Sequence, residues 1–251
     1  MIEHLTWLII AAMLIGVSKG GLASAGALAV PFLAVFMNPL QAAALLLPVI
    51  LITDLAAVWF YHGDTSPRNV AILLPAVIAG ILIAALIVPF VSEPILLAFT
   101  GCIGLWAVMR RWTQKDTTTR KDAKVAPGLF WGIFGGIATF ITHSGAPPVQ
   151  AYLLPQNLPR LIFAGTMAIT FAVSNLFKIP SYYALGFFEG LNWPLIAGLS
   201  GVGLAGTVVG RWLVKTMSEK IYGRAVEILL LILSLILLAK AGFAVLDGTV
   251  A

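Results

Sequence analysis

Two polar interruptions in otherwise apolar sequence carry the residues best suited to chemistry. Lys19 lies in the first, after Ser18 and before two glycines, and His143 lies in the second, before Ser144 and Gly145. A lysine ammonium within the apolar part of a membrane is costly, and it usually contacts a substrate or a partner charge. An imidazole titrates near physiological pH, so it can bind an anion when charged or pass a proton. The alternatives are a lysine that snorkels to the membrane surface and a hydrogen-bonded structural histidine.

The backbone of these interruptions is itself suited to anions. Glycine lowers helix propensity and an interior proline removes a backbone hydrogen bond, so a helix is expected to break at each interruption. The next helix then begins with unpaired N–H groups and a partial positive charge, which together favour an anion. The amides expected to be exposed are those of Gly20–Ser24 and Ser144–Ala146. The predicted substrate-binding residues are Lys19, Gly20, Gly21, His143, Ser144 and Gly145.

Three further polar residues lie inside apolar runs, and they are candidates for proton coupling or for support of the site. A lone carboxylate such as Asp54 is unfavourable in a span, so it is predicted to pair with a lysine, to be protonated or to belong to a proton route. Asn175 and Lys178 lie one helical turn apart in a later run. Lys178 is about two turns from the end of that run, and it is therefore also close enough to snorkel.

The composition places this chain in a membrane. Of its 251 residues, 60% are hydrophobic and 10% are charged, and the mean hydropathy is +1.01. Soluble domains carry roughly 25% charged residues, so too few charges remain here to cover a water-facing surface. The net charge of +5 lies in a few loops between apolar runs, which is typical of membrane orientation and not of nucleic-acid binding. The first apolar run lacks the basic start of a cleavable signal peptide.

The sequence shows no enzyme or cofactor pattern. Its three histidines, His4, His62 and His143, make no metal-spaced pair, and the single cysteine, Cys102, excludes a disulfide framework and a cysteine-based metal site. The glycine pair of the first interruption lacks the strand and the spacing of a nucleotide-binding loop. We therefore predict no catalytic residue, no metal and no cofactor. Any transport is expected to run on a gradient.

Six apolar runs are long enough to cross about 30 Å of hydrocarbon as helices of about 20 residues. Because every backbone polar group must be paired in lipid, helix is the expected structure. The predicted spans are 40–61, 70–91, 95–111, 161–185, 193–213 and 222–246. Two other segments, 5–36 and 129–155, are too long for one span and too short for two. Each is predicted to form two short helices of about 13 residues, joined by a break at membrane depth.

The two interruptions occupy matching places in an internal repeat. At a shift of about 120 to 126 residues, Pro31 matches Pro155 and Gly63 matches Gly186, in the same order along the chain. Internal repeats are common in secondary transporters. The expected units are a first repeat over 1–112, a cytoplasmic basic linker over 113–126 and a second repeat over 127–251.

Charge predicts how the two repeats are oriented. The stretches 110–124 and 211–224 are rich in Lys and Arg, so both are expected on the cytoplasmic side. Both stay there if the segment 129–155 enters the membrane and returns on the same side. Each half then has one re-entrant hairpin and three spans, and an odd number of spans inverts the second half. The predicted fold is an all-α integral membrane protein with an inverted repeat. The alternative, eight full spans, places one basic stretch outside.

The two interruptions also resemble the motifs of a known family. The run Gly16–Leu22, followed by Ala27–Pro31, resembles the glycine-rich first motif of the TauE/SafE sulfite exporter family, and the second motif matches His143–Pro148 through Tyr152–Pro155. The resemblance covers nearly the whole chain. It implies export of sulfite or related sulfur-containing anions, driven by ion gradients. This sequence has Lys19 where glycine is commoner in the family, and it has His143 and a proline pair where a glycine run is usual.

These features favour a secondary transporter that exports sulfite or a related sulfur-containing anion, with a proton gradient as the expected driving force. The alternatives are an uncoupled anion channel, a carrier for a sulfonate or a carboxylate, and a membrane component that does not transport. The expected location is the bacterial cytoplasmic (inner) membrane, and the expected partners are a small anionic solute and lipid, with no nucleic acid. The small residues on the spans permit either tight packing within one chain or a homodimer.

Overall fold

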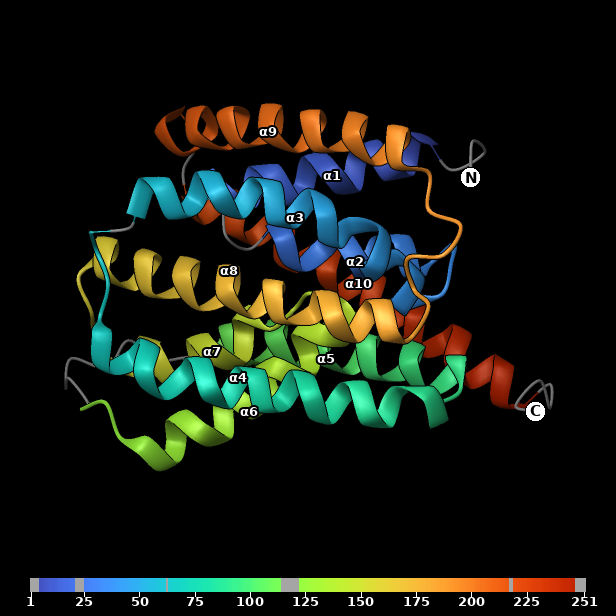
Figure 1. The fold of residues 1–251 in the computed structure, drawn as a ribbon, viewed down its shortest axis with the longest axis horizontal. Coiled ribbons are helices and arrows are strands. Elements are labelled where there is room, and N and C mark those ends of the chain that lie inside the picture. Colours follow the sequence, from blue (N-terminus) through green and yellow to red (C-terminus); the bar gives the residue numbers. More distant parts are fainter. Residues whose placement is uncertain (1–4, 21–24, 62, 114–121, 217–218, 247–251) are drawn as a thin grey trace.

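The computed structural model describes residues 5–20, 25–61, 63–113, 122–216 and 219–246, and it shows an elongated bundle of helices without a strand among these residues (Figure 1). This confirms the prediction of an all-α membrane protein. The helices of the N-terminal part are α1 Leu5–Lys19, α2 Gly26–Ala34, α3 Pro39–Tyr61, α4 Pro67–Ile87 and α5 Glu93–Thr113. Those of the C-terminal part are α6 Val125–Thr142, α7 Ala146–Leu153, α8 Arg160–Ala184, α9 Trp193–Thr216 and α10 Glu219–Leu246. Short 3-10 turns, η3 Val88–Phe90 and η4 Leu154–Gln156, follow α4 and α7.

Seven of the described helices are long and apolar enough to cross a membrane, namely α3, α4, α5, α6, α8, α9 and α10. Six of them coincide with the six predicted spans. The seventh, α6, differs from our expectation of a short arm because it has 18 residues and no proline interrupts it after its first turn. Large apolar side chains lie exposed on the outside of the bundle, as lipid requires; Phe90 is 88% exposed and Trp59 is 77% exposed.

Each broken segment forms a hairpin whose two ends lie at the same end of the bundle. Near the start of α1, the ring of Trp7 stacks on Phe36, which follows α2, with the centroids 5.0 Å apart. At the other hairpin, Asn69 near the start of α4 makes a reciprocal amide pair with Gln156 of η4, at 2.9 and 3.1 Å. Arg68 donates to the carbonyl of Ala123, just before α6, at 3.2 Å. Within the described residues, therefore, neither segment runs through the bundle from end to end, contrary to the eight-span alternative.

The first arm of each hairpin packs against a span from the other part of the chain. An added Cβ on Gly16 of α1 would overlap the carbonyl oxygen of Gly203 in α9, so the two backbones touch. In the same way, a Cβ on Gly136 of α6 would overlap the carbonyl oxygen of Val77 in α4. Both pairs of helices run parallel (Figure 1). Glycine allows this close approach, which is the usual means of helix association in lipid.

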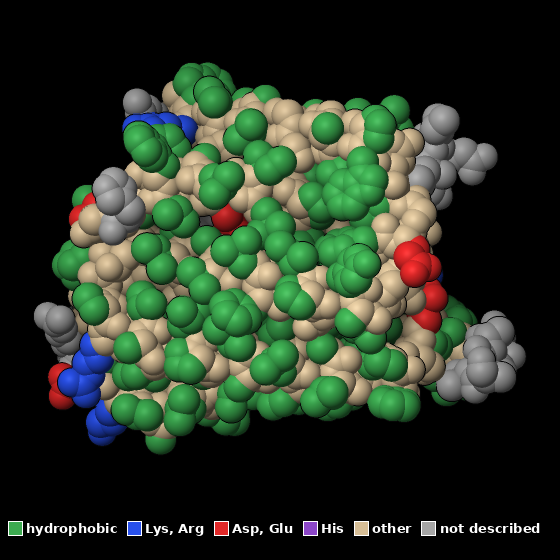
Figure 2. Space-filling view, viewed as in Figure 1, with side chains coloured by type: hydrophobic (Ala, Val, Ile, Leu, Met, Phe, Trp, Pro, Cys, Tyr) green, Lys and Arg blue, Asp and Glu red, His purple; other side chains and the backbone are tan. Residues whose placement is uncertain are grey.

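Basic side chains gather at one end of the bundle, on the left of the view in Figure 2. Arg211, near the end of α9, lies over the ring of Phe60 in α3 at 4.7 Å. Arg111, near the end of α5, pairs with Glu227 of α10 at 2.7 Å. The described parts of both basic stretches therefore lie at the same end of the bundle.

Candidate functional site

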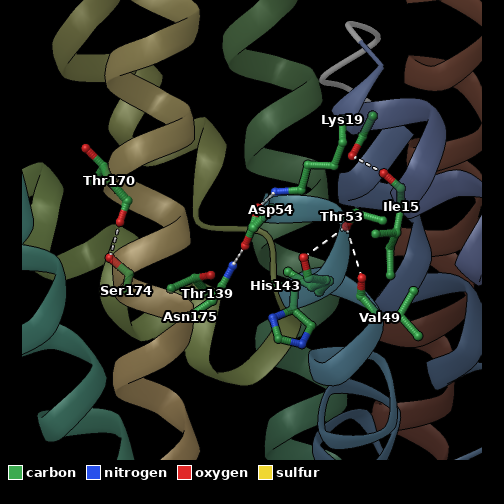
Figure 3. A network of polar contacts seen from close by, with 12 residues as sticks. Ile15, Lys19, Val49, Thr53, Asp54, Thr139, His143, Thr170, Ser174 and Asn175 are labelled. Atoms are coloured by element: carbon green, nitrogen blue, oxygen red, sulfur yellow. Dashed lines mark hydrogen bonds and ion pairs between the residues drawn. The ribbon is translucent and has the colours of Figure 1, made fainter. Parts of the chain in front are cut away.

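Asp54 of α3 is the centre of a buried polar chain that joins three helices (Figure 3). Lys19, the last residue of α1, donates from Nζ to Asp54 Oδ1. Asn175 of α8 donates from Nδ2 to Asp54 Oδ2 at 2.7 Å. The Asp54 side chain is only 3% exposed, and both of its oxygens have a partner. A carboxylate can stay ionised inside a membrane protein when it is paired in this way.

Lys178 lies one turn beyond Asn175 on α8, and its side chain has no exposed surface. Its ammonium donates to the carbonyl of Thr139 at 2.7 Å, to Thr139 Oγ1 at 2.9 Å and to His143 Nδ1 at 2.9 Å. These three acceptors satisfy the three N–H groups of an ammonium. Lys178 therefore points into the bundle, and it does not reach for the membrane surface.

His143 ends α6 in a left-handed backbone conformation, with φ of 53°. Its Nε2 lies 2.8 Å from the carbonyl oxygen of Ala43 in α3. Because a carbonyl only accepts, Nε2 must carry the hydrogen, and Nδ1 is left to accept from the ammonium of Lys178. The imidazole is thus neutral in this arrangement and links α3, α8 and the second break.

The charges of this cluster do not balance. Lys19 and Lys178 supply two ammonium groups, Asp54 supplies one carboxylate, and His143 is neutral when Lys178 donates to it. With both lysines protonated, the described residues of the cluster carry one positive charge in excess. A charge inside a membrane protein is unfavourable unless it is compensated, so the cluster favours the entry of one anion.

The second break lies against the start of α2, and its described backbone offers little free space. Ser144 Oγ lies 3.4 Å from the carbonyl oxygen of Ala27 at the start of α2. The amide of Ser144 is already used, because it donates to Thr142 Oγ1 at 3.1 Å. A Cβ on Gly145 would come within 2.6 Å of the carbonyl oxygen of Gly135, so this residue is enclosed by packing.

The first break is described only in part. Gly20 continues the helical hydrogen bonding, since its amide donates to the carbonyl of Gly16 at 3.0 Å. A Cβ on Gly20 would overlap the carbonyl oxygen of Thr207, so Gly20 also serves close packing against α9. Gly21 and the rest of the expected amide cradle, 22–24, lie outside the described residues.

The structure thus brings five of the predicted residues into one cluster: Lys19, Asp54, His143, Asn175 and Lys178. Ser144 lies beside it, whereas Gly20 and Gly145 act in packing. The sequence interpretation missed Thr139, which accepts twice from Lys178. It also missed a buried stripe along α8, where every fourth side chain is polar and fully enclosed. The members of this stripe are Thr166, Thr170, Ser174, Lys178 and Tyr182.

The spacing of this stripe is a signal that the sequence already contained, because residues four apart lie on one face of a helix. Two polar side-chain atoms of α8 are buried without a hydrogen-bond partner, the hydroxyl oxygen of Thr170 and the carbonyl oxygen Oδ1 of Asn175. Buried polar atoms are normally paired, so these two atoms are open to a further hydrogen-bond partner. Among the described residues no group of His, Cys, Asp and Glu is arranged to hold a metal.

Comparison with known proteins gives one clear result. The model of the sulfite exporter TauE/SafE family matches residues 8–237. No curated protein and no solved structure gives a significant match. The family match covers both hairpins and all seven candidate spans except the first residues of α1 and the last residues of α10. The chain therefore belongs to the TauE/SafE sulfite exporter family of multi-pass membrane transporters.

Proposed function

We propose that this chain is a secondary transporter that exports sulfite or a related small sulfur-containing anion, coupled to a proton gradient. The observation that supports this most directly is the gathering of two lysines and one carboxylate around Asp54, which has an excess positive charge when both lysines are protonated. Family membership supports the class of solute. A sulfur oxyanion accepts several hydrogen bonds from ammonium groups, and it brings the negative charge that the cluster lacks.

Within this cluster, Lys19 is the group that meets the anion. Its side chain is 20% exposed, whereas Lys178 is completely enclosed and has three fixed acceptors. Figure 2 shows an acidic side chain at the bottom of a small hollow in the region where α3 and α8 lie side by side. Lys178 then acts as a fixed positive charge behind the site. Its field favours an anion at Lys19 without direct contact.

The two halves of the chain are proposed to be related by inversion, with the first repeat over 1–112 and the second over 127–251. The packing supports this relation, since α1 packs in parallel on α9 and α6 packs in parallel on α4. In each pair, the first arm of one half meets the fourth helix of the other half. Inverted halves with broken helices at the site are the usual design for alternating access.

The end of the bundle that carries the basic residues is proposed to face the cytoplasm of a bacterial cell, with the bundle in the inner membrane. Lipid then surrounds the exposed apolar side chains. There are two alternatives that an assay must separate from this proposal. One is an uncoupled anion channel, and the other is a carrier for a sulfonate or a carboxylate.

The deciding experiment measures sulfite flux into proteoliposomes that contain the purified chain. The wild-type protein should give saturable flux, which a pH gradient accelerates. Lys19→Met should lower the flux at least tenfold, because the accessible ammonium is lost. Lys240→Met is the matched control, since Lys240 is exposed and donates to the carbonyl of Val35 at the other end of the bundle. Flux that rises linearly with sulfite and ignores the pH gradient would indicate a channel, and faster sulfonate flux would indicate another substrate.

A further inference from the structure

We infer that Asp54 carries the coupled proton and that the ammonium of Lys19 pairs in turn with Asp54 and with the transported anion. Asn175 binds the Asp54 carboxyl group in both of its protonation states. This inference rests on the proposed function, because it assigns the coupling step of that transporter to named residues. Among the residues that the structure describes, Asp54 is the one fully enclosed carboxylate, at 2% exposure.

The pairing of Lys19 with Asp54 makes anion binding and proton binding depend on each other. In the structure the ammonium of Lys19 neutralises the carboxylate of Asp54. When a transported anion takes this ammonium, Asp54 loses its counter-ion and gains a negative neighbour. Both changes favour the protonated acid. Coupling between two binding events is reciprocal, so a protonated Asp54 also releases Lys19 for the anion.

Asn175 has the groups that this change of state requires. Its Nδ2 donates to the Asp54 carboxylate at 2.7 Å, and its Oδ1 is buried without a partner. A carboxylate needs a donor, whereas a carboxylic acid needs an acceptor for its O–H. The side-chain amide of Asn175 supplies the donor in the present state. Its carbonyl can accept the O–H after Asp54 binds a proton, so Oδ1, which is unpaired in the present state, then has a hydrogen-bond partner.

Other charged or titratable groups belong to the segments around Asp54. Lys19 comes from α1, Lys178 comes from α8, and His143 comes from the break between α6 and α7. From α9, Arg211 lies over Phe60, about two turns along α3 from Asp54. Among these neighbours, Lys19 is the one that pairs directly with the carboxylate, so its departure changes the balance most.

The test measures the protons taken up when sulfite binds to the full purified chain. Calorimetric titrations at one mildly alkaline pH, in buffers of different ionisation enthalpy, give this number directly. The wild-type protein should take up close to one proton per bound sulfite. Asp54→Asn should still bind sulfite but take up none, because the amide does not titrate. Unchanged proton uptake in Asp54→Asn, or no uptake in the wild type despite sulfite binding, overturns the inference. Absence of sulfite binding in the wild type overturns the proposed function instead.

Variants of Asn175 test its part, and they keep the inference testable if Asp54→Asn does not fold. Asn175→Asp keeps the acceptor but removes the donor and adds a like charge, so proton uptake should move to higher pH by about one unit or more. Asn175→Leu removes donor and acceptor together, so the shift should be smaller. Asn38→Leu, at a distant asparagine that donates to Glu93, should leave the pH profile in place. Equal profiles for all four proteins would show that Asn175 only packs.

Discussion

The Nζ of Lys178 lies 2.9 Å from Nδ1 of His143, and the same imidazole reaches the carbonyl of Ala43 through Nε2 at 2.8 Å. This pair fixes the second hairpin to α3 and to α8 at once. Both ring nitrogens and all three ammonium hydrogens are used, so neither residue is ready to bind a solute in this state. The two lysines of the cluster therefore differ, since the Lys19 side chain is 20% exposed and Lys178 is fully enclosed.

Replacing Lys178 by methionine should reduce both stability and sulfite affinity. Methionine has a similar length, but it leaves Nδ1 of His143 without its donor, at about 1–3 kcal/mol for the buried group, whereas the Thr139 carbonyl keeps the amide of His143. It also removes the fixed positive charge. We expect a clear fall in melting temperature and at least a tenfold weaker sulfite affinity. Lys240→Met provides the comparison, and equal affinity in the two variants would contradict a role for Lys178.

Replacing His143 by glutamine should separate a structural role from a titrating one. A glutamine can donate from Nε2 to Ala43 and accept from Lys178 through Oε1, so it reproduces both contacts without a charge change near neutral pH. We expect His143→Gln to keep the pH dependence of sulfite flux and His143→Leu to lose most of the flux. A flat pH profile in His143→Gln would instead make His143 the proton carrier and not Asp54.

Adding one methyl group where two helix backbones touch should destabilise the bundle. In Gly136→Ala the new Cβ would overlap the carbonyl oxygen of Val77, so α6 and α4 must move apart. Overpacking of this kind costs about 1–3 kcal/mol. Gly201→Ala on α9 is the control, because nothing lies within 4 Å of its added Cβ. Thermal unfolding in detergent measures both, and equal melting temperatures would refute the contact.

Replacing Thr170 by valine should raise stability while it lowers flux. The Thr170 hydroxyl is buried without a partner, and valine has nearly the same shape. Removing an unsatisfied hydroxyl stabilises by about 1 kcal/mol or more. A lower flux is expected because Thr170→Val removes one hydrogen-bond donor that the α8 stripe offers to a passing anion. Thr53→Val should only destabilise, since Thr53 donates to Val49 and Ile50 at 3.0 and 2.9 Å. Unchanged flux in Thr170→Val would exclude the stripe from the path.

The sequence predicted the elements better than their contacts. Apolar runs bounded by charges predicted the six spans, and the glycine and proline clusters indicated where α1 and α6 end, because lipid permits few alternatives to helix. The length of α6 was not predictable from those clusters. Its glycines suggested a weak helix. In the structure they form the surface that packs against α4, and this packing stabilises α6 as far as its last residue, Thr142.

The partners within the site could not be predicted, since they join residues far apart in the chain. Lys19 and Asp54 are 35 residues apart, and Asn175 and Asp54 are 121 residues apart. A pairing of Asp54 with some lysine was one expectation, but the sequence could not choose between Lys19 and Lys178. The burial of Lys178 depends on how α8 is turned against α6, where Tyr182 donates to the carbonyl of Phe140. Rotational settings of this kind come from packing and not from local sequence.

The contact between α1 and α9 cannot form until the ribosome has synthesised α9. Gly16 and Gly203 are 187 residues apart, so the ribosome completes most of the chain before α1 finds the surface that covers its glycine face. Until then the glycine face of α1 lacks the helix that covers it in the finished fold. Long-range pairing of this kind slows folding. Truncated chains that stop before α9 should therefore be degraded faster by membrane proteases than the full chain, because the glycine face of α1 stays uncovered.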